Sequence, residues 1–186
     1  MKNILVVVDC QNDFLTGSLK NDEAVKKIPN IVKKIRNNNW DGIFVTQDTH
    51  DENYLMTLEG KNLPVEHCIF LTEGWEIEDN IKAALNDAKL RNIPVSYISK
   101  YTFGSLELAS NIVDFILYDL KDSDEVNIEL VGFCTDICVV SNALILKANL
   151  ENLASVSVDS SCCAGITPET HEAALTTMKM CQVKVN

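Results

Sequence analysis

The stretch VNIELVGFCTDICVVSNALILKA, residues 126–148, joins a β-branched apolar segment to a helical pattern. Val126–Val131 has the length and composition of a buried strand, and Thr135–Ala148 repeats apolar residues at helical spacing. Two cysteines, Cys134 and Cys138, lie at the junction. A strand that runs directly into a helix is the building unit of α/β proteins, so this stretch predicts the fold class.

The rest of the chain repeats this unit. We expect strands at Ile4–Val8, Gly42–Thr46, Pro94–Ser99, Val126–Val131, Ala154–Asp159 and Gln182–Val185. We expect helices at Glu23–Arg36, Glu76–Ala88, Ser105–Leu120, Thr135–Ala148 and Pro168–Lys179, the first of them bent or divided by Pro29. The alternation predicts one domain over residues 1–186, a three-layer α/β/α arrangement around a six-stranded, mostly parallel sheet.

Composition limits the classes of partner and compartment. A chain of 186 residues can bury about 70% of its unfolded surface without cross-links. The net charge of −11 argues against nucleic acid or an anionic membrane as partner. The apolar run Ile4–Val8 is short for a signal peptide, and the seven cysteines are an odd number. We therefore expect a cytoplasmic protein with reduced thiols.

Polar side chains follow four of the predicted strands. Asp9 comes after the first strand, Asp48 and His50 after the second, Lys100 after the third and Cys138 after the fourth. The carboxyl ends of parallel strands meet at one edge of the sheet, where ligands bind. These five residues are therefore the first candidates for a functional site.

The two cysteines could form a metal clip, a redox pair, buried packing, or one nucleophile with a bystander. If Thr135 caps the helix, Cys138 lies near unpaired backbone amides that lower a thiol pKa, while the Cys134 side chain is expected to point elsewhere. Spacing alone favours two core thiols, because free cysteine is usually buried. A lysine and a carboxylate at neighbouring strand ends, Lys100 and Asp9, favour the nucleophile.

The connection over residues 47–76 is long for a compact domain, and such loops are often functional. Asp48 and His50 share one face of an extended segment, and His67 follows in the same loop. A carboxylate with two imidazoles suits zinc, iron or manganese, although solvated loop residues explain this spacing more often. We expect His171 to be structural.

Six motifs occur in one order along the chain: VVVDCQNDF (6–14), QDTH (47–50), HC (67–68), ISKYTFGS (98–105), GFCTDICV (132–139) and VDSSCCAG (158–165). Together they resemble the isochorismatase-like cysteine hydrolases, the superfamily that includes nicotinamidase. The resemblance covers essentially the whole chain. Its most specific parts are the first motif and the fifth, which follow the first and fourth predicted strands.

The resemblance implies a catalytic triad of Asp9, Lys100 and Cys138. It also implies an oxyanion hole formed by the backbone N–H groups of Cys134 and Cys138, with a cis peptide bond between Phe133 and Cys134. In this scheme Cys138 provides the sulfur and Cys134 only a backbone amide.

The resemblance further implies a divalent metal, zinc first and iron or manganese next. Its ligands would be Asp48, His50 and His67, with Glu59 as the best-placed fourth. Phe14 resembles the aromatic residue that lines the substrate pocket in these enzymes, although a core phenylalanine is equally compatible with the sequence.

Two segments depart from the nicotinamidase pattern. No aromatic residue stands shortly before His67, which leaves the downstream Trp75 as a candidate, and residues 101–105 differ from the usual small residues. We predict an amidohydrolase that acts through a thioester on a small-molecule amide, nicotinamide first, and that assembles as a homo-oligomer. The alternatives are a ureido or carbamoyl hydrolase, an isochorismatase, or a receiver-like phosphoacceptor domain, which would leave CTDIC (134–138) unused.

Overall fold

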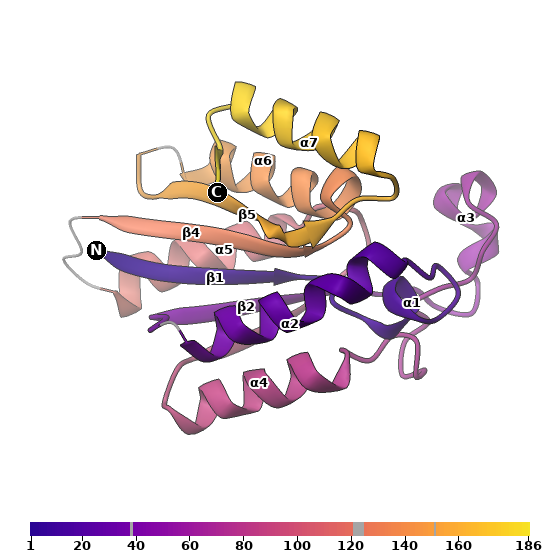
Figure 1. Cartoon of the computed structure of the whole chain (residues 1–186), viewed down its shortest axis with the longest axis horizontal. Helices are drawn as coiled ribbons and strands as arrows, with labels where there is room; N and C mark the ends of the chain where they lie inside the picture. The colour runs from indigo at the N-terminus through magenta and orange to yellow at the C-terminus, as the bar shows by residue number, and fades with distance from the viewer. Residues whose placement is uncertain (38, 121–124, 151) are drawn as a thin grey trace.

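The computed structural model describes residues 1–37, 39–120, 125–150 and 152–186. Its strands are β1 (Lys2–Val8), β2 (Gly42–Asp48), β3 (Val95–Lys100), β4 (Val126–Phe133), β5 (Ser155–Ala164) and β6 (Lys184–Val185). They form one sheet in the order β3-β2-β1-β4-β5-β6, and each neighbouring pair is parallel (Figure 1). The predicted six-stranded α/β fold is confirmed.

Helices cover both faces of the sheet because alternate residues of β1 point to opposite sides. Ile4, Val6 and Val8 join one buried cluster, and Leu5 and Val7 join the other. The first face packs against α5 (Leu106–Asp114), α6 (Val140–Leu150) and α7 (Pro168–Met180), and the second against α2 (Asp22–Asn37) and α4 (Asp79–Leu90) (Figure 1).

Two helices differ from the sequence-based expectation. α2 runs unbroken through Pro29, which is exposed, so solvent can reach the backbone group that loses its helical partner there. The helix predicted over Ser105–Leu120 is α5 followed by a π-helical segment, η2 (Phe115–Asp119). β5 is also longer than predicted, because it continues through the polar residues Ser160 and Ser161.

Short helices that the sequence did not predict lie beyond the carboxyl ends of the strands. They are α1 (Asn12–Leu15), the 3₁₀ turn η1 (Tyr54–Met56) and α3 (Leu58–Asn62). In Figure 1 α1 and α3 lie past the arrowheads of the strands, so the long connection after β2 builds up this edge of the sheet. Within the described ranges, no helix combines the length and apolarity needed to cross a membrane.

Candidate active site

Asp9, Lys100 and Cys138 meet at the carboxyl edge of the sheet, and we call them the nucleophile group. The Lys100 ammonium lies 2.7 Å from Asp9 Oδ2 and 3.6 Å from Cys138 Sγ. Thr46 donates a 2.7 Å hydrogen bond to the other oxygen of Asp9. Asp9 and Cys138 follow the adjacent strands β1 and β4, and Lys100 reaches them from β3, on the far side of β2. The lysine stem is long enough to span that gap.

Burial and neighbouring charges together shift the pKa values of the nucleophile group. Burial lowers the pKa of Lys100, but Asp9, Cys138 and Asp48 outweigh it, so the net pKa is well above the usual value. Burial raises the pKa of Asp9 despite the charge of Lys100. Burial and the Asp9 carboxylate also raise the pKa of the Cys138 thiol. The expectation of a depressed thiol pKa is therefore wrong for the free protein, in which the pKa values of both the Cys138 thiol and the Asp9 carboxyl are raised.

The helix that carries Cys138 begins one residue earlier than predicted. Cys134 is the N-cap, the peptide bond between Phe133 and Cys134 is cis as predicted, and a π-helical turn, η3, covers Thr135–Val139. Thr135 is therefore inside the first turn and not the cap. Its hydroxyl lies 2.8 Å from Nδ1 of His171, which places that histidine in a structural contact, as expected.

The π turn changes which backbone amides donate hydrogen bonds to the Cys134 carbonyl. It accepts hydrogen bonds from the amides of Ile137, at 3.2 Å, and Val139, at 3.0 Å. In a regular α-helix this carbonyl would accept from the amide of Cys138. The turn therefore frees the Cys138 amide from its usual helical acceptor, which is the condition for donating to a ligand atom.

Asp48, His50, Glu59 and His67 form a second cluster, which we call the metal group. Their ligand atoms all lie within 4.8 Å of one another. Nε2 of His50 and of His67 lie 3.1 Å and 3.5 Å from Asp48 Oδ2, and each lies 3.7 Å from Glu59 Oε1. Nδ1 of His67 bonds the Val65 carbonyl at 2.8 Å, which leaves Nε2 facing the group. Two imidazoles and two carboxylates that converge in this way fit a divalent transition metal.

The charges of the metal group are coupled to the nucleophile group. Burial raises the pKa of Asp48, but hydrogen bonds from His50 and His67 and the charge of Lys100 hold the net value far below the usual range. Burial lowers the pKa of His67, but hydrogen bonds to Asp48 and to the Val65 carbonyl, together with the charges of Asp48 and Glu59, outweigh it and raise the net value. Asp48 Oδ1 lies 2.9 Å from the Lys100 ammonium, so one carboxylate links the two groups.

Gln11 fixes the backbone of Asp48, a role that sequence reasoning missed. Its side-chain amide donates to the Asp48 carbonyl at 2.8 Å, and its oxygen accepts from the Asp48 amide at 2.7 Å. The same Nε2 donates to the carbonyl of Trp75 at 2.9 Å, and the Trp75 indole donates to Thr49. Trp75 is thus part of this support. It does not line the cavity described below, so it does not replace the aromatic residue that nicotinamidases carry shortly before the position of His67.

Asp13 and Tyr54 hold the loop that carries His67. The Asp13 carboxylate accepts a 2.7 Å hydrogen bond from the amide of Cys68, the residue after His67, whose φ is 48°. A Cβ at Gly74 would collide with that carboxylate, which explains the glycine. Tyr54 is fully buried, and its ring centroid lies 4.9 Å from that of His67. Asp13 lies in the first motif and could have been suspected, whereas no sequence signal marks Tyr54.

A cavity of about 570 Å³ opens above both groups. Phe14 lies on its wall, with its ring centroid 5.8 Å from that of His67. Both Cys134 and Cys138 contribute to its lining, although Cys134 packs in the core cluster of the α2 and α4 face and Cys138 in the cluster of the opposite face. The lining residues are Phe14, Ser18, Leu19, Lys20, Asp48, Glu59, Leu63, His67, Phe103, Cys134, Ile137, Cys138 and Ile166.

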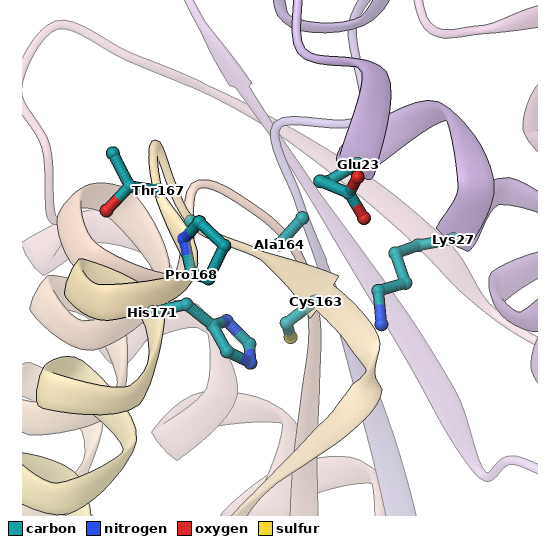
Figure 2. A pocket seen from close by; sticks show the side chains of 8 residues that line it. Glu23, Lys27, Cys163, Ala164, Thr167, Pro168 and His171 are labelled. Carbon is teal, nitrogen blue, oxygen red and sulfur yellow. The ribbon is translucent and has the colours of Figure 1, made fainter.

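A second hollow, of about 130 Å³, lies between the start of α2 and the segment that joins β5 to α7 (Figure 2). Glu23 and Lys27 line one side, and Cys163 and His171 lie opposite (Figure 2). None of its lining residues belongs to the nucleophile group or the metal group. The larger cavity is therefore the candidate active site.

Comparison with known proteins agrees with this architecture. The isochorismatase domain model matches residues 3–185. The nicotinamidase/pyrazinamidase PncA of Bacillus subtilis is 25% identical with a TM-score of 0.78, and the pyrazinamidase of Pyrococcus horikoshii in complex with zinc is 26% identical with a TM-score of 0.74. Both matches cover 100% of this chain and 99% of the other.

The pyrazinamidase/nicotinamidase of Streptococcus mutans, 22% identical, shares the fold with a TM-score of 0.80 and full coverage of both chains, 100% each. No curated protein matches the sequence significantly. The resemblance to isochorismatase-like enzymes related to nicotinamidase is confirmed. The match spans the whole sheet and every residue of both groups, and the chain belongs to the isochorismatase family.

Proposed function

We propose that this chain is a cysteine-dependent amidohydrolase that cleaves the C–N bond of a small carboxamide, with nicotinamide as the first candidate. The observation that carries the proposal is the Cys138 sulfur, 3.6 Å from Lys100 and on the wall of a ligand-sized cavity. The family, and relatives described as nicotinamidases and pyrazinamidases, support an amide as substrate.

In the proposed reaction Asp9 accepts the proton of the Cys138 thiol as the sulfur attacks the carboxamide carbon. The backbone amides of Cys134 and Cys138 receive the developing oxyanion. Collapse of the tetrahedral species breaks the C–N bond, and Asp9 returns the proton to the departing ammonia. Water then attacks the thioester carbon and Asp9 accepts its proton. The C–S bond breaks, Asp9 passes the proton to the Cys138 sulfur, the carboxylic acid is released and the free thiol is restored.

Lys100 has two tasks in this scheme. Its ammonium, 2.7 Å from Asp9, holds the carboxylate beside the sulfur, and it stabilises the thiolate that forms during attack. In this proposal Asp9, whose pKa is raised by burial, is the base that takes the thiol proton during the attack.

The residues Asp48, His50, Glu59 and His67 would hold a divalent metal, with zinc as the first candidate. When bound, such a cation supplies a Lewis acid that orients the substrate and lowers the pKa of coordinated water. The support for zinc is the donor set, together with a pyrazinamidase of the same fold that was crystallised with zinc.

An ammonia-release screen tests the proposed function. The zinc-loaded protein is offered nicotinamide, pyrazinamide, short aliphatic carboxamides and ureido acids. Release of ammonia from carboxamides supports the proposal, and release only from ureido acids would assign the chain to the ureido hydrolases. Failure to release ammonia from every compound would overturn the proposed chemistry.

We also propose a reducing, cytoplasmic location and a homo-oligomeric state. All seven cysteines, each within the described residues, are free, which fits a compartment where thiols stay reduced. Light scattering coupled to size exclusion measures the assembly, and a mass equal to one chain would contradict the oligomer.

A further inference from the structure

The candidate cavity is larger than a single-ring carboxamide requires. Its volume of about 570 Å³ equals that of about 19 water molecules at about 30 Å³ each. A carboxamide on one six-membered ring has about half that number of non-hydrogen atoms. A cavity of this size lies in the range of about 300–1,000 Å³ that buries drug-sized ligands.

Outside the metal group the walls of the cavity are mainly apolar, with Ser18 and Lys20 as the polar exceptions. Phe14 is buried beside the metal group, whereas Leu63, Phe103 and Ile166 are 38%, 47% and 59% exposed. Leu63 follows α3, Phe103 lies in the β3–α5 loop and Ile166 lies in the β5–α7 loop. Apolar groups from three separate segments therefore surround the opening. Exposed apolar groups grouped at a pocket indicate a ligand that covers them.

Charged groups on the wall are restricted to two places. Asp48, Glu59 and His67 belong to the metal group, which the contact between Asp48 and Lys100 links to the nucleophile group. Lys20 is exposed and pairs with Asp22 at 3.1 Å. The acyl part of a substrate attached at Cys138 therefore contacts mainly apolar side chains before it reaches solvent.

We propose that the acyl site selects carboxamides whose acyl part is apolar and longer than a single ring, such as medium-chain aliphatic or aryl-alkyl primary amides. This inference rests on the proposed amidohydrolase function and specifies its substrate class. Leu63, at the wall and half-open to solvent, is the residue that sets how much chain the site accepts.

A series of straight-chain primary amides, from butanamide to octanamide, tests the inference on the zinc-loaded protein. Each added methylene that leaves water for the cavity should raise kcat/KM about fourfold. The expected gain over the series is therefore about 200-fold. Values of kcat/KM that stay flat or fall with chain length, while nicotinamide is hydrolysed, would overturn the inference and leave the amidohydrolase intact.

Leu63→Trp is the matched variant, because a larger side chain fills the outer part of the cavity. It should lower kcat/KM for octanamide about tenfold or more and leave butanamide within about twofold. Leu90→Trp is the control, since Leu90 is 83% exposed at the end of α4 and is not part of the cavity wall. Equal effects of the two tryptophans on octanamide would overturn the assignment of Leu63.

Calorimetric binding of butanoate, hexanoate and octanoate separates the two proposals if no amide is hydrolysed. Affinity that rises with chain length, and that Leu63→Trp removes, would support the apolar acyl site while the proposed chemistry fails. Binding that is independent of chain length would overturn the acyl site, whatever the enzyme does with amides.

Discussion

The nucleophile group and the metal group lie side by side, yet the chain positions them by different means. Asp9 and Lys100 sit at or just past strand ends, where the ladder of the sheet fixes their backbones, and Cys138 lies in the turn η3 that directly follows β4. In the metal group only Asp48 ends a strand, and His50, Glu59 and His67 come from the connection after β2. The first group is set by topology and the second by loop structure.

This difference has a physical consequence. Gln11 holds the backbone of Asp48 through two hydrogen bonds, whereas His67 depends on the bond from the Cys68 amide to Asp13 and on the packing of Tyr54. These supports come from side chains and not from the ladder of the sheet. Substitutions in the nucleophile group should therefore abolish turnover while the protein still binds its metal. Substitutions in the residues that support the metal group should instead lower the metal affinity, and turnover should fall for that reason.

The largest effect is expected from Cys138→Ala. Without the sulfur no thioester forms, so ammonia release should fall by about 10⁴-fold or more, while metal content and fold stay unchanged. Cys134→Ala is the matched control, because it keeps the backbone amide and should retain activity within about tenfold. Ammonia release is measured for both at saturating zinc, and equal losses would refute the division of roles between the two cysteines.

A smaller loss is expected when the metal group is disabled. His50→Ala, or removal of the metal by a chelator, should lower turnover about 100-fold, because positioning of the substrate is lost while the nucleophile group persists. Zinc should restore the chelated wild type but not the variant. If metal-free protein turns over at the normal rate, the metal group has no part in the reaction.

Loss of Gln11 should weaken the metal site without removing a ligand. Gln11→Ala releases both backbone bonds to Asp48 and should reduce zinc affinity by about 10- to 100-fold, measured by competition with a chromophoric chelator. Saturating zinc should recover much of kcat. Asn12→Ala, which loses one exposed bond to the Glu73 carbonyl, is the control with unchanged affinity. Equal affinities for all three proteins would show that the loop does not depend on Gln11.

The smallest effect is expected outside both groups. Burial raises the pKa of Asp159, but Lys34 and Ser161 outweigh it and hold the net value below the ordinary one. Because the folded pKa is lowered, the stabilisation is present above the ordinary carboxyl range, near pH 4, and is lost as the pH falls through the folded value.

Asp159→Asn should therefore cost about 1 kcal/mol of unfolding free energy at pH 7, measured in urea, and much less in acid. Activity and zinc affinity should not change. A difference from wild type that grows as the pH falls would contradict the assignment.

The convergence of Asp9, Lys100 and Cys138 could be predicted from the sequence because strand ends in a parallel sheet meet at one edge. Apolar runs located β1, β3 and β4, and this topology then brings Asp9, Lys100 and Cys138 together. The resemblance supplied Glu59, which spacing alone would not single out. The cis bond before Cys134 was also predicted from the resemblance and is confirmed.

Other features depend on tertiary context that no local pattern carries. The raised pKa of Cys138 follows from burial and from Asp9, neither of which the helix-cap argument includes. The π turn follows from hydrogen bonds to the Cys134 carbonyl, so Thr135 was wrongly expected to be the cap. The position of Trp75 depends on how the whole loop folds. Its closeness to His67 in the sequence therefore does not predict whether it lines the cavity, and it does not.

The most direct test is the site of acylation. The zinc-loaded protein is mixed with the best carboxamide from the screen, quenched in acid during turnover, digested and sequenced by tandem mass spectrometry. The account predicts that the acyl mass sits on the sulfur at position 138, whereas an acylated Cys134, or rapid turnover with no acylated cysteine, would contradict it.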